Sequence, residues 1–324
     1  MRREKLSEPN HIPCGIAIPQ VFPDSRVDME LIRRFAIRAE TLKYQGLWVQ
    51  EQILGRAYCL EPLSLLSYLA GITTNTSLGT AVVIASTRNP VLLAKSLATL
   101  DQMSNGRLIA GIALGGVAKK YPLLGGPSNR RVRHFVESVE VIKAIWTQSG
   151  ANYAGHFWNM RDEISEPKPV QQPHPPLWFG GRHEDSLRRA ARYADGWIGA
   201  GSTTTVQFRN HVSTLVAALE ESGRDPSQFP ISKRVYVSLD PDENRAERGL
   251  RTWFDHRYGN ADLGSEVSVW GSASRCIEGL IEVVESGAQM IILDTPVEPF
   301  RNMETLHAEV VPNLPLPTLH PTGP

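Results

Sequence analysis

The sequence has too few cysteines, too widely spaced, to suggest a covalent or metal-held scaffold. Only Cys14, Cys59 and Cys276 occur in 324 residues, and no two of them have C-x-x-C spacing. An odd number of distant thiols is typical of neither a disulfide framework nor a zinc site. Neither kind of scaffold is therefore expected.

The sequence also lacks an excess of charge of either sign. Its 34 basic and 34 acidic residues cancel, so no net field attracts a nucleic acid or an anionic membrane. No apolar run approaches the ~18 residues of a membrane span, and the charged start MRREKLSEPNH is followed by no apolar stretch typical of a signal peptide. We expect a cytoplasmic protein whose partners include neither a nucleic acid nor a membrane.

Several motifs of cofactor binding and catalysis are missing too. The sequence has no G-x-G-x-x-G after the first predicted strand, no G-x-x-x-x-G-K-[ST], no H-E-x-x-H and no G-x-S-x-G. The sequence therefore offers no motif that supports a dehydrogenase with a nucleotide-binding fold, a P-loop protein, a zinc protease or an α/β-hydrolase.

What the sequence does contain is organised around the stretch from residue 77 to 114. The apolar runs 78–85 and 108–114 lack the polar alternation of a half-exposed sheet, so they suit parallel strands covered on both faces. Between them, Pro90 suits the first turn of a helix, and Asn105-Gly106 supplies the left-handed residue that ends it. This pattern predicts a βαβ unit.

Short apolar strands and amphipathic helices alternate along the rest of the chain. The strands are predicted at 14–18, 47–49, 78–84, 108–114, 177–179, 197–200, 235–239 and 290–293. The helices are predicted at 28–44, 62–72, 90–104, 130–146, 186–193, 205–222, 244–254 with 274–285, and 301–311. These repeats, in a length that suits ~250 residues or more for one domain, predict an α/β fold of the (β/α)8 TIM barrel type over an open doubly wound sheet.

Two connections are too long for plain barrel loops and are predicted as insertions after strands four and seven. The first contains a β-hairpin at 153–162 and a proline-rich return at 167–176. The second, 259–272, is interpreted as a mobile lid or, alternatively, a disordered surface loop. We predict one domain at 13–313, preceded by an N-terminal extension at 1–12 and followed by a Pro-rich tail at 314–324.

Two glycine-rich turns follow neighbouring strands late in the predicted barrel. In the first, Gly180-Gly181 lets backbone amides approach an anion at the start of a helix, and Arg182 can grip a phosphate. The second, 199–204, repeats the arrangement with hydroxyl groups. The pattern predicts phosphate binding. The alternative is two ordinary turns with helix caps at Asp185 and Ser202.

A few cationic and aromatic residues on predicted strands have two interpretations each. Lys233 and Arg234, with Tyr236 beside them, could present cations to an acidic substrate or cofactor tail, or could simply be the charged start of a strand. Trp178 and Trp197 are interpreted as core residues, with an aromatic wall beside a cofactor as the alternative.

Taken in order along the chain, several short segments of the sequence resemble those of one family. LGTAVV, RNP, LAKSLATLDQMSNGRL and GIALGG, followed by PKPVQQPHPPLWFGG at 167–181 and LRRAARYADGW at 187–197, resemble the bacterial luciferase-like oxidoreductases that depend on flavin or deazaflavin. The resemblance runs from about Cys14 to about Asn313. It implies a barrel in which the βαβ unit holds one edge of the flavin ring.

The resemblance also implies where the cofactor would bind. In this family a cis peptide bond without proline forms a bulge in the third strand, and here it falls on Ala81-Val82. The implied cofactor residues are Thr80, Ala81, Val82, Leu114, Gly115, Gly180, Gly181, Arg182, His183, Gly199, Ala200, Gly201 and Ser202. The alternatives are a plain buried strand at 80–83 and an ordinary surface histidine at position 183.

Glu51 and Gln52 stand where relatives carry an acid followed by a catalytic histidine, so the resemblance implies a catalytic position. Glutamine cannot exchange a proton near neutral pH, and the proton transfer of the family does not carry over to Gln52. Glu51 is the remaining ionisable group, and its alternative role is an ion pair with Arg88 or Arg56. Leu114 is a second departure, because luciferase itself has an arginine there near the flavin phosphate.

We therefore expect an oxidoreductase that transfers hydride between a flavin-type cofactor and a small organic substrate. The two departures favour coenzyme F-420 slightly over FMN. The alternatives are an FMN-dependent monooxygenase supplied by a partner flavin reductase, and a barrel that binds flavin without catalysis. No metal is expected. The resemblance implies a homodimer formed through the helices at 62–72 and 90–104, which could equally cover only the barrel.

Overall fold

The structure is a computed structural model that describes residues 10–22, 26–55, 57–116 and 121–317. Most of the predicted extension and of the predicted tail lies outside these residues, as does Arg56. Where both ends of the barrel region are described, the amide of Ile12 donates a hydrogen bond of 2.9 Å to the carbonyl of Pro315.

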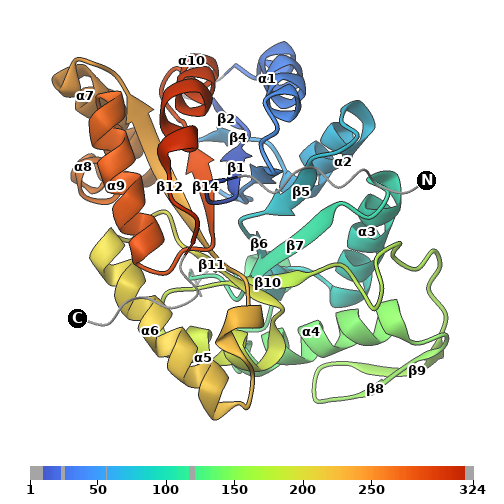
Figure 1. Cartoon of the computed structure of the whole chain (residues 1–324). Helices are drawn as coiled ribbons and strands as arrows, with labels where there is room; N and C mark the ends of the chain where they lie inside the picture. The colour runs from blue at the N-terminus through green and yellow to red at the C-terminus, as the bar shows by residue number, and fades with distance from the viewer. Residues whose placement is uncertain (1–9, 23–25, 56, 117–120, 318–324) are drawn as a thin grey trace.

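Eight parallel strands close into a barrel, which confirms the predicted fold class (Figure 1). In spatial order they run β10-β11-β12-β14-β1-β3-β5-β7, and pairing of β7 with β10 closes the ring. Their bounds are β1 Cys14–Ala17, β3 Gly46–Val49, β5 Ser77–Thr80, β7 Leu108–Ala113, β10 Leu177–Gly180, β11 Gly196–Gly199, β12 Ile231–Leu239 and β14 Met290–Asp294.

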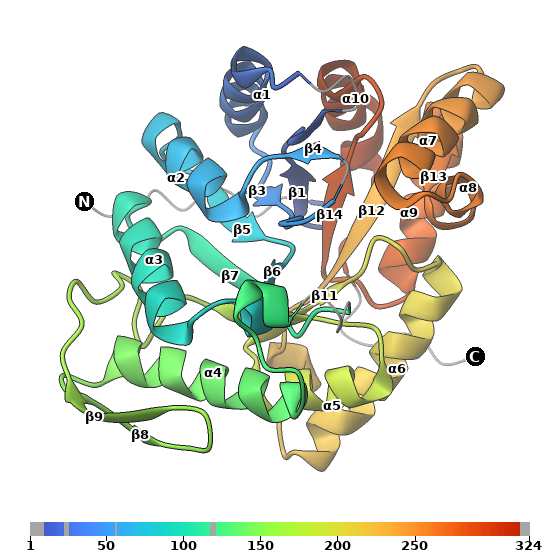
Figure 2. The same ribbon diagram turned by 180° about the vertical axis from the view of Figure 1, so that it is seen from behind.

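Helices surround the barrel, and Figure 2 shows α2, α3, α4, α5 and α6 following one another around its outside. The bounds are α1 Met29–Thr41, α2 Pro62–Ile72, α3 Pro90–Met103, α4 Arg131–Thr147, α5 Glu184–Tyr193, α6 Thr205–Glu221, α7 Glu243–Tyr258, α8 Asp262–Val267, α9 Ala273–Glu285 and α10 Pro299–Thr305. After α10 the chain continues in a π-helical turn, Leu306–Val310, and a short 3-10 turn, Val311–Asn313.

The βαβ unit forms as predicted, and its ends show why. Pro90 begins α3, and the side chain of Asn89 accepts hydrogen bonds from two amides of the first turn at 2.9 and 3.2 Å. After the helix, Asn105 and Gly106 take positive φ angles of 52° and 74°. A left-handed residue ends a helix in this way because it turns the chain away from the helix axis.

Two predicted strands differ from the observed ones. The third is not continuous over 78–84, because it divides into β5 and a short β6, Val83–Ile84, on either side of a cis peptide bond. The seventh begins at Ile231 rather than at 235, so Lys233 and Arg234 lie inside β12 and not before it. All nine residues of β12 are buried. The tertiary contacts of this strand therefore outweigh the low β-strand propensity of the charged residues near its start.

The two predicted insertions are both present. After α4 the hairpin consists of β8, Ala151–Ala154, and β9, Asn159–Glu163. The alternative of a disordered surface loop at 259–272 is wrong, because this segment contains α8 and β13, Val269–Gly271, and β13 pairs with β12. The interpretation as a mobile lid stays a prediction. A further small sheet, β2 (Val21–Phe22) with β4 (Tyr58–Cys59), is not predicted from the sequence.

The inside of the barrel is filled by Trp48 from β3 and Trp178 from β10, whose ring centroids lie 5.8 Å apart. Their size requires small neighbours. A Cβ atom added at Gly15 or at Gly79 would lie 2.3 Å from the Trp48 indole. The interpretation of Trp178 as a core residue is confirmed, and the two indoles form a floor inside the barrel.

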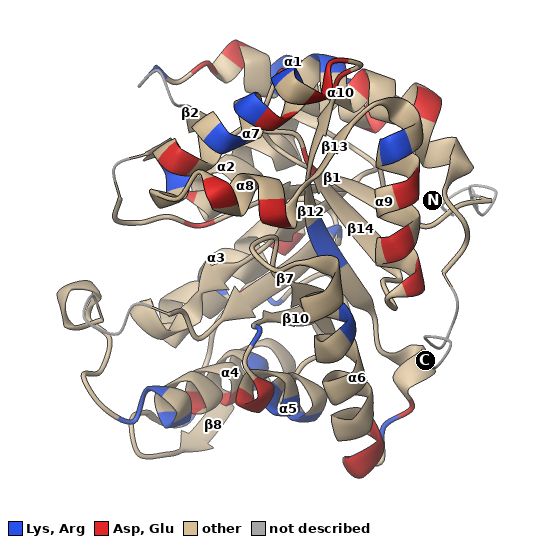
Figure 3. Ribbon diagram, turned by 90° about the vertical axis from the view of Figure 1, so that its left-hand side faces the viewer, with Lys and Arg blue, Asp and Glu red and all other residues tan. Residues whose placement is uncertain are grey.

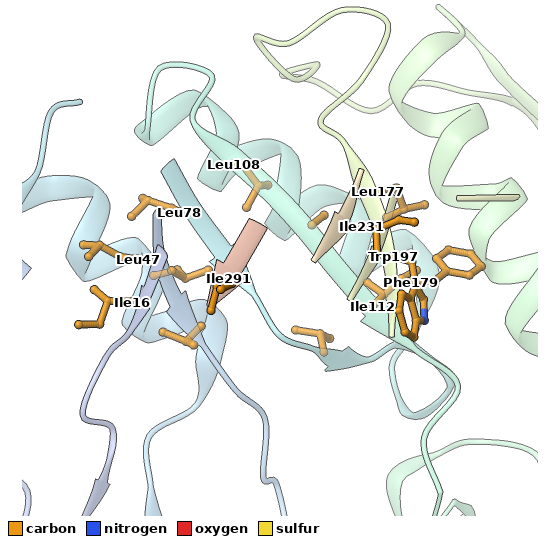
Figure 4. Packing of buried hydrophobic residues seen from close by; sticks show 14 of the residues in the cluster. Ile16, Leu47, Leu78, Leu108, Ile112, Leu177, Phe179, Trp197, Ile231 and Ile291 are labelled. Atoms are coloured by element: carbon orange, nitrogen blue, oxygen red, sulfur yellow. The ribbon is translucent and has the colours of Figure 1, made fainter. Parts of the chain in front are cut away.

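Outside the strands, a second apolar layer joins the barrel to its helices. Figure 4 shows side chains from successive strands, among them Leu47, Leu78 and Leu108, gathered in this layer. Trp197 belongs to it as well, because its ring stacks on Phe208 of α6 with an interplanar angle of 8°. Burial of this layer on the side facing away from the barrel axis leaves the strand ends free to carry polar groups.

Within the described ranges, no helix combines the length and the apolar character needed to cross a bilayer. In the same residues, no cluster of three or more His, Cys, Asp or Glu side chains could hold a metal ion.

Candidate active site

The carboxyl end of β5 carries the bulge that the resemblance implies. The peptide bond between Ala81 and Val82 is cis, which confirms that expectation. The Ala81 amide donates a hydrogen bond of 2.7 Å to the carbonyl of Val49. Thr80 is fully buried, and its hydroxyl donates to the carbonyl of Gly111 at 2.6 Å. The Thr80 hydroxyl is therefore used in the barrel wall, while Ala81 and Val82 form the bulge itself.

The first glycine turn lies directly against this bulge. A Cβ atom added at Gly180 would lie 2.9 Å from a methyl group of Val82, so only glycine fits there without displacement. Gly180 pairs with Ile198 of β11 in register, which places the ends of β10 and β11 side by side. The structure thus brings the bulge and both glycine turns together at one end of the barrel.

The turn after β10 begins α5. His183 is the N-cap residue, and its amide donates to the Ser186 hydroxyl at 3.1 Å, so Asp185 is not the cap. The His183 side chain is 81% exposed. Arg182 is exposed, and among the described residues it forms no hydrogen bond or ion pair. An exposed guanidinium beside free amides at a helix N-terminus can receive an anion.

The turn after β11 is held from behind by a buried lysine. Lys233 donates to the carbonyl of Ala200, and to the carbonyl and hydroxyl of Thr203 at 2.9 and 2.8 Å. Burial, helped by the neighbouring Arg234, lowers the pKa of Lys233 to about 7. Lys233 therefore positions this turn and does not face the mouth of the barrel.

Other residues of this second turn are placed by packing. A Cβ atom added at Gly199 would lie 2.7 Å from Phe208, and one at Gly201 would lie 2.8 Å from Tyr236. Thr204 caps α6 by accepting from the amide of Gln207 at 3.2 Å, so Ser202 is not the cap. Ordinary packing thus explains these glycines, and phosphate binding by Ser202 stays a prediction.

The side chain of Glu51 is fully buried in an ion pair with Arg88, the alternative that the sequence leaves open. Its second oxygen accepts from the amide of Ile84 at 2.5 Å, and Arg88 also reaches Glu61 at 2.8 Å. Burial raises the pKa of the Glu51 carboxyl, although Arg88 opposes this shift. The contact with Ile84 fixes β6 just after the bulge, so Glu51 acts on the bulge through the backbone.

Gln52 and the turn after β7 are placed by local contacts. The Gln52 carboxamide lies over Gly55, where an added Cβ atom would be 1.6 Å from its nitrogen. The Tyr121 hydroxyl donates to the carbonyl of Leu114 and, at 3.0 Å, to that of Gly115. Gly115 has a positive φ of 83°. Catalysis by Glu51 or Gln52 and cofactor contact at Leu114 and Gly115 stay predictions.

A polar cluster on the opposite side of the mouth is largely missed by the sequence reasoning. Arg234 points inward from β12, where it is only 9% exposed, and pairs with Asp294 at the end of β14 through its Nε atom at 2.9 Å. Its Nη2 atom donates to the Gln50 side-chain oxygen at 3.0 Å, and Arg257 of α7 donates to the same oxygen at 3.4 Å. Figure 3 shows the basic residues of β12 in blue near the middle of the molecule.

Gln50 is itself held by a reciprocal pair of hydrogen bonds. The Gln20 side chain donates to the Gln50 carbonyl at 2.7 Å and accepts from the Gln50 amide at 2.6 Å. Below the cluster, the hydroxyls of Tyr236 and Tyr258 lie 2.7 Å apart. Reading the ends of the first and last strands would have pointed to Gln20 and Asp294, whereas nothing in the sequence marks Arg257.

A cavity of about 320 Å³ opens beside this cluster. Its wall includes Gln20, Gln50 and Asp294, together with apolar side chains from β2, α1 and α7. An adjoining smaller space shares Gln20 and Gln50 with it and reaches Ala81 and Arg234. Side-chain donors and acceptors thus lie on one side of the bulge, and backbone turns with a free arginine lie on the other. Such an arrangement can hold an anionic group and a small organic molecule on either side of a planar ring.

Comparison with known proteins identifies relatives. A family model described as luciferase-like monooxygenase matches residues 14–290. An uncharacterized protein of Mycobacterium tuberculosis is 38% identical over 167 residues, which is 51% of this chain and 58% of that protein. The FMNH(2)-dependent dimethylsulfone monooxygenase of Pseudomonas putida is 31% identical over 204 residues, or 61% of this chain and 55% of that protein. The matches thus span little more than half the length of these relatives.

Among solved structures, an F420-dependent secondary alcohol dehydrogenase in complex with an F420-acetone adduct is similar with a TM-score of 0.81. The match covers 94% of this chain and 99% of that one, at 19% sequence identity. At this identity the likeness supports the fold alone.

Proposed function

The chain belongs to the luciferase-like monooxygenase family, and from this premise we propose that it is an oxidoreductase that uses a flavin-type cofactor and transfers hydride between the cofactor ring and a small organic substrate. The observation that carries this proposal is the cis bulge at Ala81-Val82, which packs against Gly180. Ala81 lines a small space that adjoins the cavity of about 320 Å³. Backbone that is free of bulky side chains at such a point allows a planar ring to approach closely.

Different residues of the chain would bind different parts of the cofactor. We assign the ring to the bulge, and the phosphate of the cofactor to the turn at Gly181, Arg182 and His183. There Arg182 has no partner among the residues described, and α5 presents its N-terminus. Ala200 and Ser202 lie in the turn that Lys233 holds and would also contact the cofactor phosphate. The apolar floor of Trp48 and Trp178 would exclude water from beneath the ring. When bound, the cofactor supplies the redox chemistry.

Between the two cofactors, we favour coenzyme F-420. Gln52 takes the position of the family's proton-transferring histidine, and Leu114 takes that of luciferase's arginine near the FMN phosphate. A side chain that holds no exchangeable proton near neutral pH suits an enzyme whose cofactor carries out two-electron hydride transfer without oxygen.

A second candidate function is an FMN-dependent monooxygenase that receives reduced flavin from a partner reductase. The specific observation in its favour is the 31% identity to the FMNH(2)-dependent dimethylsulfone monooxygenase. Three further expectations stay predictions: the small-molecule substrate, the cytoplasmic location, and a homodimer through α2 and α3, where Leu92 is 69% exposed.

The decisive test is a parallel titration of purified protein with coenzyme F-420 and with FMN, followed by absorbance and fluorescence quenching. We expect tight binding of the deazaflavin and weak binding of FMN. The reverse order would favour the monooxygenase, and binding of neither would overturn the cofactor proposal.

A matched pair of glycine variants locates the binding. Gly180→Ala places a Cβ atom 2.9 Å from Val82 and should weaken cofactor binding roughly tenfold or more, because the bulge must shift. Gly71→Ala, on the exposed surface of α2, meets no atom of the described residues within 4 Å and should bind as the wild type does. Equal affinities of the two variants would place the cofactor elsewhere.

A further inference from the structure

Lys233 is a buried cation without a carboxylate partner. The residue is 2% exposed, and among the described residues its side chain forms no ion pair. It donates instead to the carbonyl of Ala200 and to the carbonyl and hydroxyl of Thr203. An ammonium has three N–H donors, so these three acceptors match its protonated form. Burial of a charge without an opposite charge is nevertheless costly, and burial lowers the pKa of Lys233 to about 7.

The charged groups around Lys233 add to its positive charge. Arg234 follows it on β12 and helps to lower the pKa of Lys233. On α6, burial lowers the pKa of His211, and the charges of Lys233 and Arg182 add to this shift. Lys233 also lies 5.6 Å from the ring centre of Phe208, near the start of α6. The charge of Lys233 thus lies close to the N-terminus of α6, which is the positive end of the helix dipole.

The carboxylates of the first glycine turn do not offset this charge. Glu184 pairs with Arg188 at 3.1 Å, and Asp185 lies 3.8 Å from the ring of His183. Both carboxylate side chains are mostly exposed, so solvent and salt screen them. Neither contacts Lys233.

The turn that Lys233 holds presents free backbone amides. Three consecutive amides of this turn donate to no acceptor among the described residues, those of Gly201, Ser202 and Thr203. Across a trans peptide, the carbonyl of one residue and the amide of the next point in opposite directions. The hydrogen bond from Lys233 to the Ala200 carbonyl therefore directs the Gly201 amide away from the lysine. In the first glycine turn, the amides of Gly181 and Arg182 also donate to no described residue.

We propose that Lys233 supplies the buried positive charge of an anion site formed by the two glycine turns, and that a dianion bound there draws a proton onto the lysine. The negative charge of the dianion favours the ammonium over the neutral amine. The proton comes from the solvent, and the amine nitrogen takes it up. As a statement about the phosphate site this rests on the proposed function, but proton uptake with an anion is testable without any cofactor.

The direction of the pH dependence follows from linkage between the anion and the proton. Without an anion, Lys233 loses its proton at about pH 7. With a dianion bound, it should lose the proton at a higher pH. Between these two values binding takes up a proton, so the affinity for the dianion should fall as the pH rises, by at most about tenfold per pH unit.

The test is titration of the protein, without added cofactor, with sodium sulfate at about pH 7.5 and about pH 9 and at constant ionic strength. Sulfate stays a dianion over this range, whereas a phosphate group can change its charge near neutral pH. The NMR shifts of the amides of Gly181 and Gly201 report binding. We expect the wild type to bind sulfate roughly threefold to tenfold more weakly at the higher pH.

Variants separate the charge of Lys233 from its position. Lys233→Gln keeps a donor for the Ala200 carbonyl but carries no charge, so its affinity for sulfate should be low and equal at the two pH values. Lys143→Gln is the matched control, because Lys143 also donates to a carbonyl, that of Tyr193 at 2.8 Å, at the opposite end of α5 from the turn. This control should keep the fall in affinity.

Two histidine variants show which group takes up the proton. His183 lies in the first glycine turn, and His211 lies near Lys233. His183→Asn and His211→Asn should both keep the fall in affinity between the two pH values. A fall that is lost in either variant would assign the proton to that histidine and overturn the proposal.

A second measurement needs no variant and serves if Lys233→Gln does not fold. The carbon NMR shifts of the Lys233 side chain, followed against pH, should show its titration move to higher pH when sulfate is added. An unchanged titration of Lys233 would overturn the proposal. So would the absence of sulfate binding, equal affinities of the wild type at the two pH values, or a fall that survives Lys233→Gln.

The same protein preparation separates this inference from the proposed function. If sulfate binds with the expected dependence on pH but neither coenzyme F-420 nor FMN binds, the anion site with its lysine stands and the oxidoreductase assignment falls. If a cofactor binds and the affinity for sulfate does not depend on Lys233, the oxidoreductase assignment stands and the inference about the lysine falls.

Discussion

Two partly buried charged clusters flank the mouth of the barrel, and their ratios of arginines to carboxylates are opposite. On the side of the bulge, one arginine, Arg88, serves two carboxylates, Glu51 and Glu61. On the side of the cavity, two arginines, Arg234 and Arg257, share one carboxylate, that of Asp294, and one amide oxygen, that of Gln50.

The two clusters also differ in what balances the excess charge. The surplus of negative charge in the first is met by backbone amides: Ile84 donates to Glu51 at 2.5 Å, and Ser64 donates to Glu61 at 2.7 Å. In the second cluster, the Nε atom of Arg257 is buried and has no acceptor among the described residues. The first cluster is thus satisfied by the chain itself, whereas the second leaves one buried donor unsatisfied.

The largest expected effect comes from breaking the completed cluster. Arg88→Ala would leave the buried Glu51 carboxylate without its cation and should lower the free energy of unfolding by about 3 kcal/mol, as measured by urea denaturation. Arg33→Ala breaks a pair whose side chains are 48% and 60% exposed, so it should change the free energy of unfolding little or not at all. Equal losses in the two variants would show that the Arg88 cluster is not structural.

The same isosteric change in each cluster should affect stability differently. Asp294→Asn leaves the buried Arg234 guanidinium without its carboxylate and should lower the free energy of unfolding by about 3 kcal/mol. Glu51→Gln keeps the acceptor for the Ile84 amide and leaves Arg88 paired with Glu61, so its loss should be smaller. Urea denaturation measures both. Equal losses in Asp294→Asn and Glu51→Gln would contradict the distinction between the clusters.

Lys233 is a third buried cation, held by carbonyl and hydroxyl oxygens instead of a carboxylate. Burial lowers its pKa from 10.5 to about 7, so between these pH values the unfolded chain binds a proton that the folded chain lacks. The free energy of unfolding should therefore rise with pH through this window, by up to about 1.4 kcal/mol per pH unit.

The measurement is urea denaturation at about pH 7.5 and about pH 9. Lys233→Met should lose this rise, and Lys95→Met, which removes a surface lysine, should keep it. If the wild type and Lys233→Met show the same dependence on pH, the lysine is not the group that titrates.

Local patterns in the sequence were sufficient for the framework of the site. Pro90 and Asn105-Gly106 mark the ends of a helix because their backbone preferences act within a few residues. The position of the bulge at Ala81-Val82 followed from the resemblance to a family, since no local propensity announces a cis bond. The alternative of a disordered loop at 259–272 was wrong because the helix and strand of this segment are stabilised by packing on α7 and β12, which composition does not reveal.

By itself, the sequence determined the alternation of strands and helices, the closed barrel that this alternation builds, and the two glycine turns at its mouth, because each depends on periodicity or on backbone freedom within a short segment. Only the tertiary structure decided which charges meet. Gln50 lies 184 positions from Arg234 and 207 from Arg257. Barrel closure brings these distant residues together, and the balance of charge among them exists only once they are in contact.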